Sequence, residues 1–121
     1  MLDLIIKNGS CYIDKDLKDQ DIAIKDGKII KIGKIDNEAK EVFDAKGLTV
    51  LPGCIDTQTH FREPGSTDTE DLHSGSRAAI VGGITSVFEM PNTNPPTSTK
   101  VEFQKKLDLA KNRMYCNYAF Y

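Results

Sequence analysis

The sequence predicts an α/β protein in which a short β segment precedes alternating strands and helices. Residues 1–50 contain short runs in which apolar and polar residues alternate, as in strands with one buried face. From residue 51 onward, strand-like runs alternate with segments of helical periodicity. Strands joined through helices lie parallel, so residues 51–121 are expected to form βαβ units around a parallel sheet. The predicted domain boundary therefore lies between residues 50 and 51.

A hairpin at residues 21–33 is the clearest element of the first part. Its two arms alternate apolar and polar residues, and Asp26-Gly27 separates them. Both residues tolerate the positive φ angles that a two-residue type I′ turn requires. The other strands predicted in this part are residues 4–6, closed by a turn at Asn8-Gly9, then 42–43 and 48–51.

The second part is predicted to hold strands at residues 54–60, 84–90 and 114–121, with Cys54 buried in the first of them. The first helix is expected to begin at a capping box, Thr67 to Glu70, and to end at Gly82-Gly83. The second is expected to begin at another capping box, Thr99 to Glu102, with Lys105 and Lys106 on its solvated face. Three strands cannot close an eight-stranded barrel, which takes about 250 residues, so the chain is expected to be cut off within a domain.

Composition limits the partners. The net charge of −2 gives no reason to expect nucleic acid or an anionic membrane. No apolar run approaches the roughly 20 residues of a membrane span, and the first residues lack the basic region of a signal peptide. Three cysteines, odd in number and far apart, form no finger or disulfide pattern. These features predict a soluble, cytoplasmic protein without nucleic-acid or membrane partners.

Polar residues gather at the end of the first strand of the second part. Asp56, Gln58 and His60 are two residues apart, which places them on one face of a regular strand, and Arg62 continues the series. In a barrel, the carboxyl ends of strands face the active site, where an imidazole and a guanidinium could hold a metal and an anion. The alternative is a strand that ends in polar residues because it meets solvent, and spacing alone favours that alternative.

A second polar segment, residues 91–96, follows the next strand, so Asn92 is expected at the same end of the sheet. The alternative is an ordinary turn, where Asn and Pro are common. Two further residues are assigned structural roles. Glu63 is expected to hold the turn at Pro64-Gly65, and His73 is expected on the solvated surface of the first helix.

Read together, these segments resemble one family. Residues 51–65, LPGCIDTQTHFREPG, are similar to the first barrel strand of dihydroorotases, whose pattern is PG-x-ID-x-H-x-HFREPG. Residues 89–93, EMPNT, are similar to the family's DMPNT segment. The resemblance implies a metal-dependent hydrolase with a (β/α)8 barrel, preceded by a small β-sandwich-like segment at residues 1–50. HFREPG together with MPNTNP is expected to separate dihydroorotases from hydantoinases and allantoinases.

The resemblance also implies roles for individual residues. His60 would be a metal ligand, and His60, Arg62 and Asn92 would bind substrate. Gln58 stands where the family has its first metal-binding histidine, so affinity for the expected Zn²⁺ would be weakened or lost. The implied activity is reversible ring closure of N-carbamoyl-L-aspartate to dihydroorotate in pyrimidine biosynthesis, by a homo-oligomer when intact. Residues 1–121 alone are expected to be inactive.

Two alternatives remain open. Because Gln58 replaces a ligand, the protein could be a non-catalytic homologue that serves as a scaffold for a partner such as aspartate carbamoyltransferase. The other alternative is a hydrolase of the hydantoinase or allantoinase type, which acts on a different cyclic amide.

Overall fold

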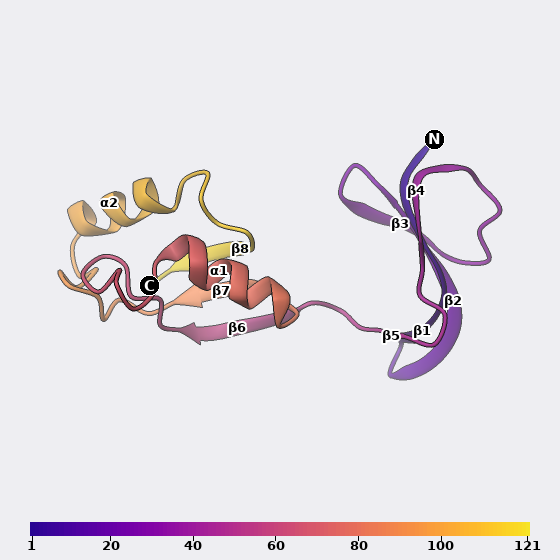
Figure 1. The fold of residues 1–121 in the computed structure, drawn as a ribbon, viewed down its shortest axis with the longest axis horizontal. Helices are drawn as coiled ribbons and strands as arrows, with labels where there is room; N and C mark the ends of the chain where they lie inside the picture. The colour runs from indigo at the N-terminus through magenta and orange to yellow at the C-terminus, as the bar shows by residue number, and fades with distance from the viewer. The chain divides into compact units, whose positions relative to one another are not determined.

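The computed structural model describes residues 1–121, which divide into two compact units, Met1–Pro52 and Gly53–Tyr121 (Figure 1). The first unit contains only strands, and the second alternates strands with helices. The two helices have 10 and 11 residues, and neither could span a membrane. The elements are β1 (Leu2–Ile13), β2 (Asp16–Lys25), β3 (Lys28–Gly33), β4 (Ala39–Asp44), β5 (Thr49–Val50), β6 (Cys54–Thr59), α1 (Leu72–Val81), β7 (Ile84–Glu89), α2 (Lys100–Ala110) and β8 (Asn117–Phe120).

The first unit is one five-stranded mixed sheet with the order β3-β2-β1-β4, in which β5 also pairs with β1. The prediction of a sandwich-like segment is wrong, because all five strands belong to the same sheet. The predicted hairpin is confirmed: β2 and β3 pair antiparallel, and Asp26 and Gly27 between them have φ angles of 50° and 71°. Its core is formed by Ile5, Ala23 and Ile35.

The predicted turn at Asn8-Gly9 is wrong, since β1 runs through it. The register against β2 shifts between Ile6 and Gly9, and Asn8 has a φ angle of 61°, so the pair forms a bulge inside a long strand. Pairing with other strands explains why the strand continues. The Asn8 backbone N–H donates to Asp21 at 3.0 Å, and its side-chain amide donates to Asp44 at 2.9 Å.

The second unit confirms the predicted βαβ pattern. β6, β7 and β8 form a parallel three-stranded sheet in that order, with α1 connecting β6 to β7 and α2 connecting β7 to β8 (Figure 1). The unit is an α/β fold with three strands, and it does not itself form an eight-stranded barrel. Its core is built from buried residues of β7, both helices and the segments that flank them: Phe61, Leu72, Val87, Ala110 and Cys116.

The start of α1 lies later than predicted. Asp71 caps the helix, accepting the Ser74 backbone N–H at 2.6 Å, while the Ser74 hydroxyl accepts the Asp71 N–H at 3.1 Å. Hydrogen bonds from the backbone and the side chain of Ser74 to the carboxylate lower the pKa of Asp71. The predicted box at residues 67–70 instead forms a turn, since the Ser66 carbonyl accepts the N–H groups of Thr69 and Glu70.

The other helix start is confirmed, because Thr99 caps α2 and accepts the Glu102 N–H at 3.2 Å. The prediction that Cys54 is buried is wrong. Cys54 is exposed, because it opens β6, which pairs on one side only and lies at the edge of the sheet.

Candidate active site at the ends of β6 and β7

The two polar segments singled out in the sequence meet at one end of the parallel sheet. His60 directly follows β6, and Asn92 lies three residues beyond the last residue of β7. The Met90 backbone N–H donates to the Thr59 carbonyl at 2.9 Å, so the two strands are still paired where the segments leave the sheet. Both segments therefore start from a common, hydrogen-bonded base.

His60 and Asn92 are in direct contact, with 3.0 Å between His60 Nδ1 and Asn92 Oδ1. An amide oxygen only accepts hydrogen bonds, so this contact assigns the imidazole proton to Nδ1. In the neutral imidazole of that tautomer, the lone pair lies on Nε2. Both residues are exposed. The pairing of these side chains, 32 positions apart in the chain, is the central feature of the site.

The prediction that Asp56, Gln58 and His60 share one strand face is wrong for Asp56. The ladder pairs Asp56 with Val87 and Thr59 with Glu89, so three residue steps on β6 match two on β7. This irregularity moves the alternation by one residue. The ladder thus aligns Asp56 and Thr59 with Val87 and Glu89, the buried residues of β7.

The two segments also touch through their backbones. The Asn94 N–H donates to the Pro64 carbonyl at 3.0 Å. Gly65 has a φ angle of +119°, and a Cβ atom there would lie 2.7 Å from both the Cβ and the carbonyl oxygen of Asn94. Glycine is required at this position by the backbone angle and by the close approach. The segment after β6 thus packs directly on the segment after β7.

Glu63 fastens the first segment to both helices. Its carboxylate accepts the Leu72 N–H at 2.9 Å and two hydrogen bonds from the Arg113 guanidinium at 2.8 and 3.0 Å. Arg113 lies beyond the end of α2 and also donates to the Leu109 carbonyl at 3.0 Å. The hydrogen bond with Glu63 raises the pKa of Arg113. Glu63 is buried, and its carboxylate connects the elements that carry Leu72 and Arg113, while its predicted role at the Pro64-Gly65 turn stays a prediction.

The segment that follows β7 is held by a buried ion pair that the sequence analysis did not predict. Lys106 of α2 forms an ion pair with Glu89, the last residue of β7, and the side chains are 1% and 0% exposed. The prediction that Lys106 is solvated is therefore wrong: it lies on the buried face of α2 with Ala110, and its ammonium is 5.2 Å from the centre of the Phe120 ring. Burial raises the pKa of Glu89 to about 7, and the paired Lys106 ammonium opposes that rise. The sequence offered one signal for a buried basic partner, namely an acidic residue at the end of the predicted strand 84–90.

The side chains of Gln58 and Arg62 make no hydrogen bond to His60 or Asn92. Both are exposed. Gln58 and His60 line a cavity of about 360 Å³, together with Asp56 and Glu70 among others. His73 is exposed, as predicted, although its Nδ1 lies 3.3 Å from the Arg113 carbonyl oxygen.

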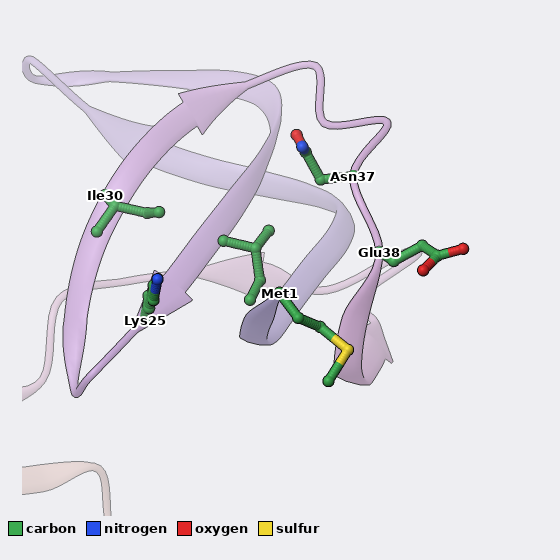
Figure 2. Close-up of a pocket in the computed structure, with 6 residues that line it drawn as sticks. Met1, Lys25, Ile30, Asn37 and Glu38 are labelled. Atoms are coloured by element: carbon green, nitrogen blue, oxygen red, sulfur yellow. The ribbon is translucent and has the colours of Figure 1, made fainter.

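These residues do not make a metal site by themselves. No group of three His, Cys, Asp or Glu side chains is placed to hold an ion, and Gln58 adds only a neutral amide beside His60. A cavity of about 430 Å³ in the first unit offers no such group either (Figure 2). Its lining includes Leu2, Ile30 and the oppositely charged Lys25 and Glu38.

The fold and the site define an α/β chain with successive βα units whose polar groups converge at the carboxyl ends of parallel strands. The amidohydrolase family profile matches residues 49–121, and the chain belongs to that family. An allantoinase from Escherichia coli O1:K1 / APEC is 46% identical over 113 residues, which are 93% of this chain and 25% of the allantoinase. The chain thus spans a quarter of the length of this relative.

Solved structures agree. The L-hydantoinase (dihydropyrimidinase) from Arthrobacter aurescens superposes with a TM-score of 0.90 at 35% identity, covering 100% of this chain and 28% of the hydantoinase. A D-hydantoinase (dihydropyrimidinase) from Thermus sp. superposes with a TM-score of 0.81 at 31% identity, covering 98% of this chain and 27% of the D-hydantoinase. The predicted membership of the amidohydrolases is confirmed. These relatives favour the hydantoinase and allantoinase alternative over dihydroorotase.

Proposed function

We propose that this chain forms the first part of a cyclic amide hydrolase of the hydantoinase or allantoinase type. In this proposal, residues 1–50 are a small β domain and residues 51–121 begin the barrel domain. The observation that supports the proposal most directly is the 3.0 Å contact between His60 and Asn92, which brings two strand ends to one point. Identities of 46% to an allantoinase and 35% to a hydantoinase support the choice of substrate class.

The substrate would be a ring that contains amide groups, and the chain offers it polar groups of three kinds. Arg62 presents a planar fork of N–H donors, which suits carbonyl oxygens as well as a carboxylate. The Asn92 amide nitrogen can donate to a ring oxygen while its Oδ1 stays on His60. His60, with its proton on Nδ1, offers a lone pair on Nε2. Their proposed task is to bind and orient the ring.

An assay of ring opening tests this proposal in the longest natural polypeptide that carries the chain. Allantoin, hydantoin, dihydrouracil and dihydroorotate would be compared at equal concentration. Turnover of allantoin, hydantoin or dihydrouracil, with none of dihydroorotate, is the expected result. Turnover of dihydroorotate alone would restore the dihydroorotase hypothesis, and turnover of none would favour a non-catalytic scaffold. Residues 1–121 alone are expected to show no turnover, because they carry only the first strand ends of the proposed site.

Two substitutions address the residues. Arg62→Met and Asn92→Ala are each expected to lower kcat/KM about 10- to 100-fold, the loss of one or two good hydrogen bonds to the substrate. Arg77→Met is the matched control, since Arg77 is also an exposed arginine but lies on α1. An unchanged kcat/KM in Arg62→Met would remove Arg62 from the site.

A further inference from the structure

The buried pair Glu89–Lys106 lies at the root of the segment that carries Asn92. Glu89 is the last residue of β7, and three residues later Asn92 meets His60. Lys106 belongs to α2, the helix that follows the same segment. The ion pair therefore joins the two ends of the stretch from residue 90 to residue 105, and it closes that stretch into a loop whose base is fixed.

The backbone around Glu89 ties all three strands together. Its carbonyl accepts the Tyr121 N–H at 3.1 Å, and the next N–H, from Met90, donates to the Thr59 carbonyl at 2.9 Å. Thr59 immediately precedes His60. A movement of Glu89 would thus displace both His60 and Asn92. His60 follows Thr59 directly, and Asn92 lies three residues after Glu89.

Stability alone does not account for an ion pair in this place. Taking two charges out of water costs several kcal/mol per ion, and apolar side chains of similar size are often as stable. A buried ion pair does differ from an apolar contact in being directional, since the carboxylate must face the ammonium. Here Lys106 is also set over the Phe120 ring of β8, which limits its positions further.

We propose that Glu89 and Lys106 are positioning residues, which hold the segment after β7 so that Asn92 reaches His60. The inference deepens the proposed function, because it names what organises the site that would receive the cyclic amide. It does not depend on turnover, since the contact between His60 and Asn92 can be observed directly. Neither Glu89 nor Lys106 is exposed, so neither contacts substrate.

Histidine NMR offers a direct test, because the chain of 121 residues has two histidines, His60 and His73. In the ¹⁵N-histidine-labelled chain, Asn92→Ala gives the His60 Nδ1 shift that marks the lost contact. The test variant is Glu89→Gln with Lys106→Met, which removes both charges and keeps the side-chain sizes. We expect its His60 signal to move more than half of the way to the Asn92→Ala value, with His73 unchanged.

The matched control is Glu102→Gln with Lys105→Gln, which removes an ion pair on the exposed side of the same helix. It is expected to leave both histidine signals in place. A folded test variant whose His60 signal stays at the wild-type position would overturn the proposal. If that variant does not fold, Lys106→Arg decides, since it keeps the charge and changes the geometry: a displaced His60 signal supports positioning, and an unmoved one overturns it.

Kinetics in the longest natural polypeptide separate this inference from the proposed function. If both hold, the test variant and Asn92→Ala lower turnover by similar factors, while the control variant does not. If the His60 signal moves as expected but the polypeptide opens no ring amide, the proposed function fails and the positioning role stands.

Discussion

The segments that follow β6 and β7 are fastened by ion pairs of opposite kinds. Glu63, in the first, accepts three hydrogen bonds of 2.8 to 3.0 Å, and its partner Arg113 has a side chain that is 35% exposed. Glu89, at the root of the second, pairs with Lys106, and both are out of contact with water. A pair that shares its charge with solvent and backbone can lose one contact and keep others. A fully buried pair has no other contacts to compensate for a lost partner. Substitutions in the pair at the second segment are therefore expected to lower the unfolding free energy more than substitutions in the pair at the first.

The largest expected effect comes from breaking the buried pair on one side. Above the Glu89 pKa of about 7 the carboxylate is charged, so there Glu89→Ala leaves the Lys106 ammonium buried without its counter-charge, and such a loss costs about 3–5 kcal/mol of unfolding free energy. Urea denaturation followed by circular dichroism measures it. The double variant Glu89→Gln with Lys106→Met should come much closer to wild type, because no charge remains buried. Equal destabilisation by both variants would show that shape, and not charge, determines stability here.

A smaller effect is expected from pH. Burial raises the pKa of Glu89 from 4.5 to about 7, so the folded state binds this proton more tightly than the unfolded chain does. The contribution to stability is therefore fully present below about pH 4.5 and is lost as the pH rises through about 7. Urea denaturation at several pH values should show the fall in wild type and a flatter profile in Glu89→Gln.

The same contrast explains how much of the second unit could be predicted from the sequence. Periodicity and turn residues are local, and they predicted the hairpin at Asp26-Gly27, the βαβ order and the cap at Thr99. They also placed His60 and Asn92 at the same end of the sheet, because parallel strands carry their carboxyl ends to one edge. Their contact at 3.0 Å is consistent with that placement.

Local sequence patterns could not predict the features that depend on residues far apart in the chain. Lys106 looks like one of two solvated lysines until Glu89, 17 positions earlier, is known to be buried beside it. The irregularity of β6 arises from its pairing with β7, so Asp56 left the expected face. Two short segments, HFREPG and MPNTNP, also suggested dihydroorotase in particular. Identity to an allantoinase over 113 residues covers far more of the chain than either segment, and it supports the wider amidohydrolase family.

The smallest expected effect concerns the pair of Glu63 with the partly exposed Arg113. Glu63→Gln keeps an acceptor for the Leu72 N–H but removes the charge that Arg113 faces, so unfolding free energy should fall by only about 1 kcal/mol. The His73 NMR signal should move as well, because the Arg113 carbonyl lies 3.3 Å from its Nδ1, while His60 should move less.

Glu102→Gln provides the reference for this last variant. It removes the carboxylate that Lys105 contacts at 2.8 Å on the surface of α2, and a pair of that kind contributes about 0.5 kcal/mol or less. A loss from Glu63→Gln as large as that from Glu89→Ala would contradict the distinction, because it would mean that water and backbone do not compensate at Glu63. An intermediate loss with an unmoved His73 signal would place the effect at the start of α1 instead, where Glu63 accepts the Leu72 N–H.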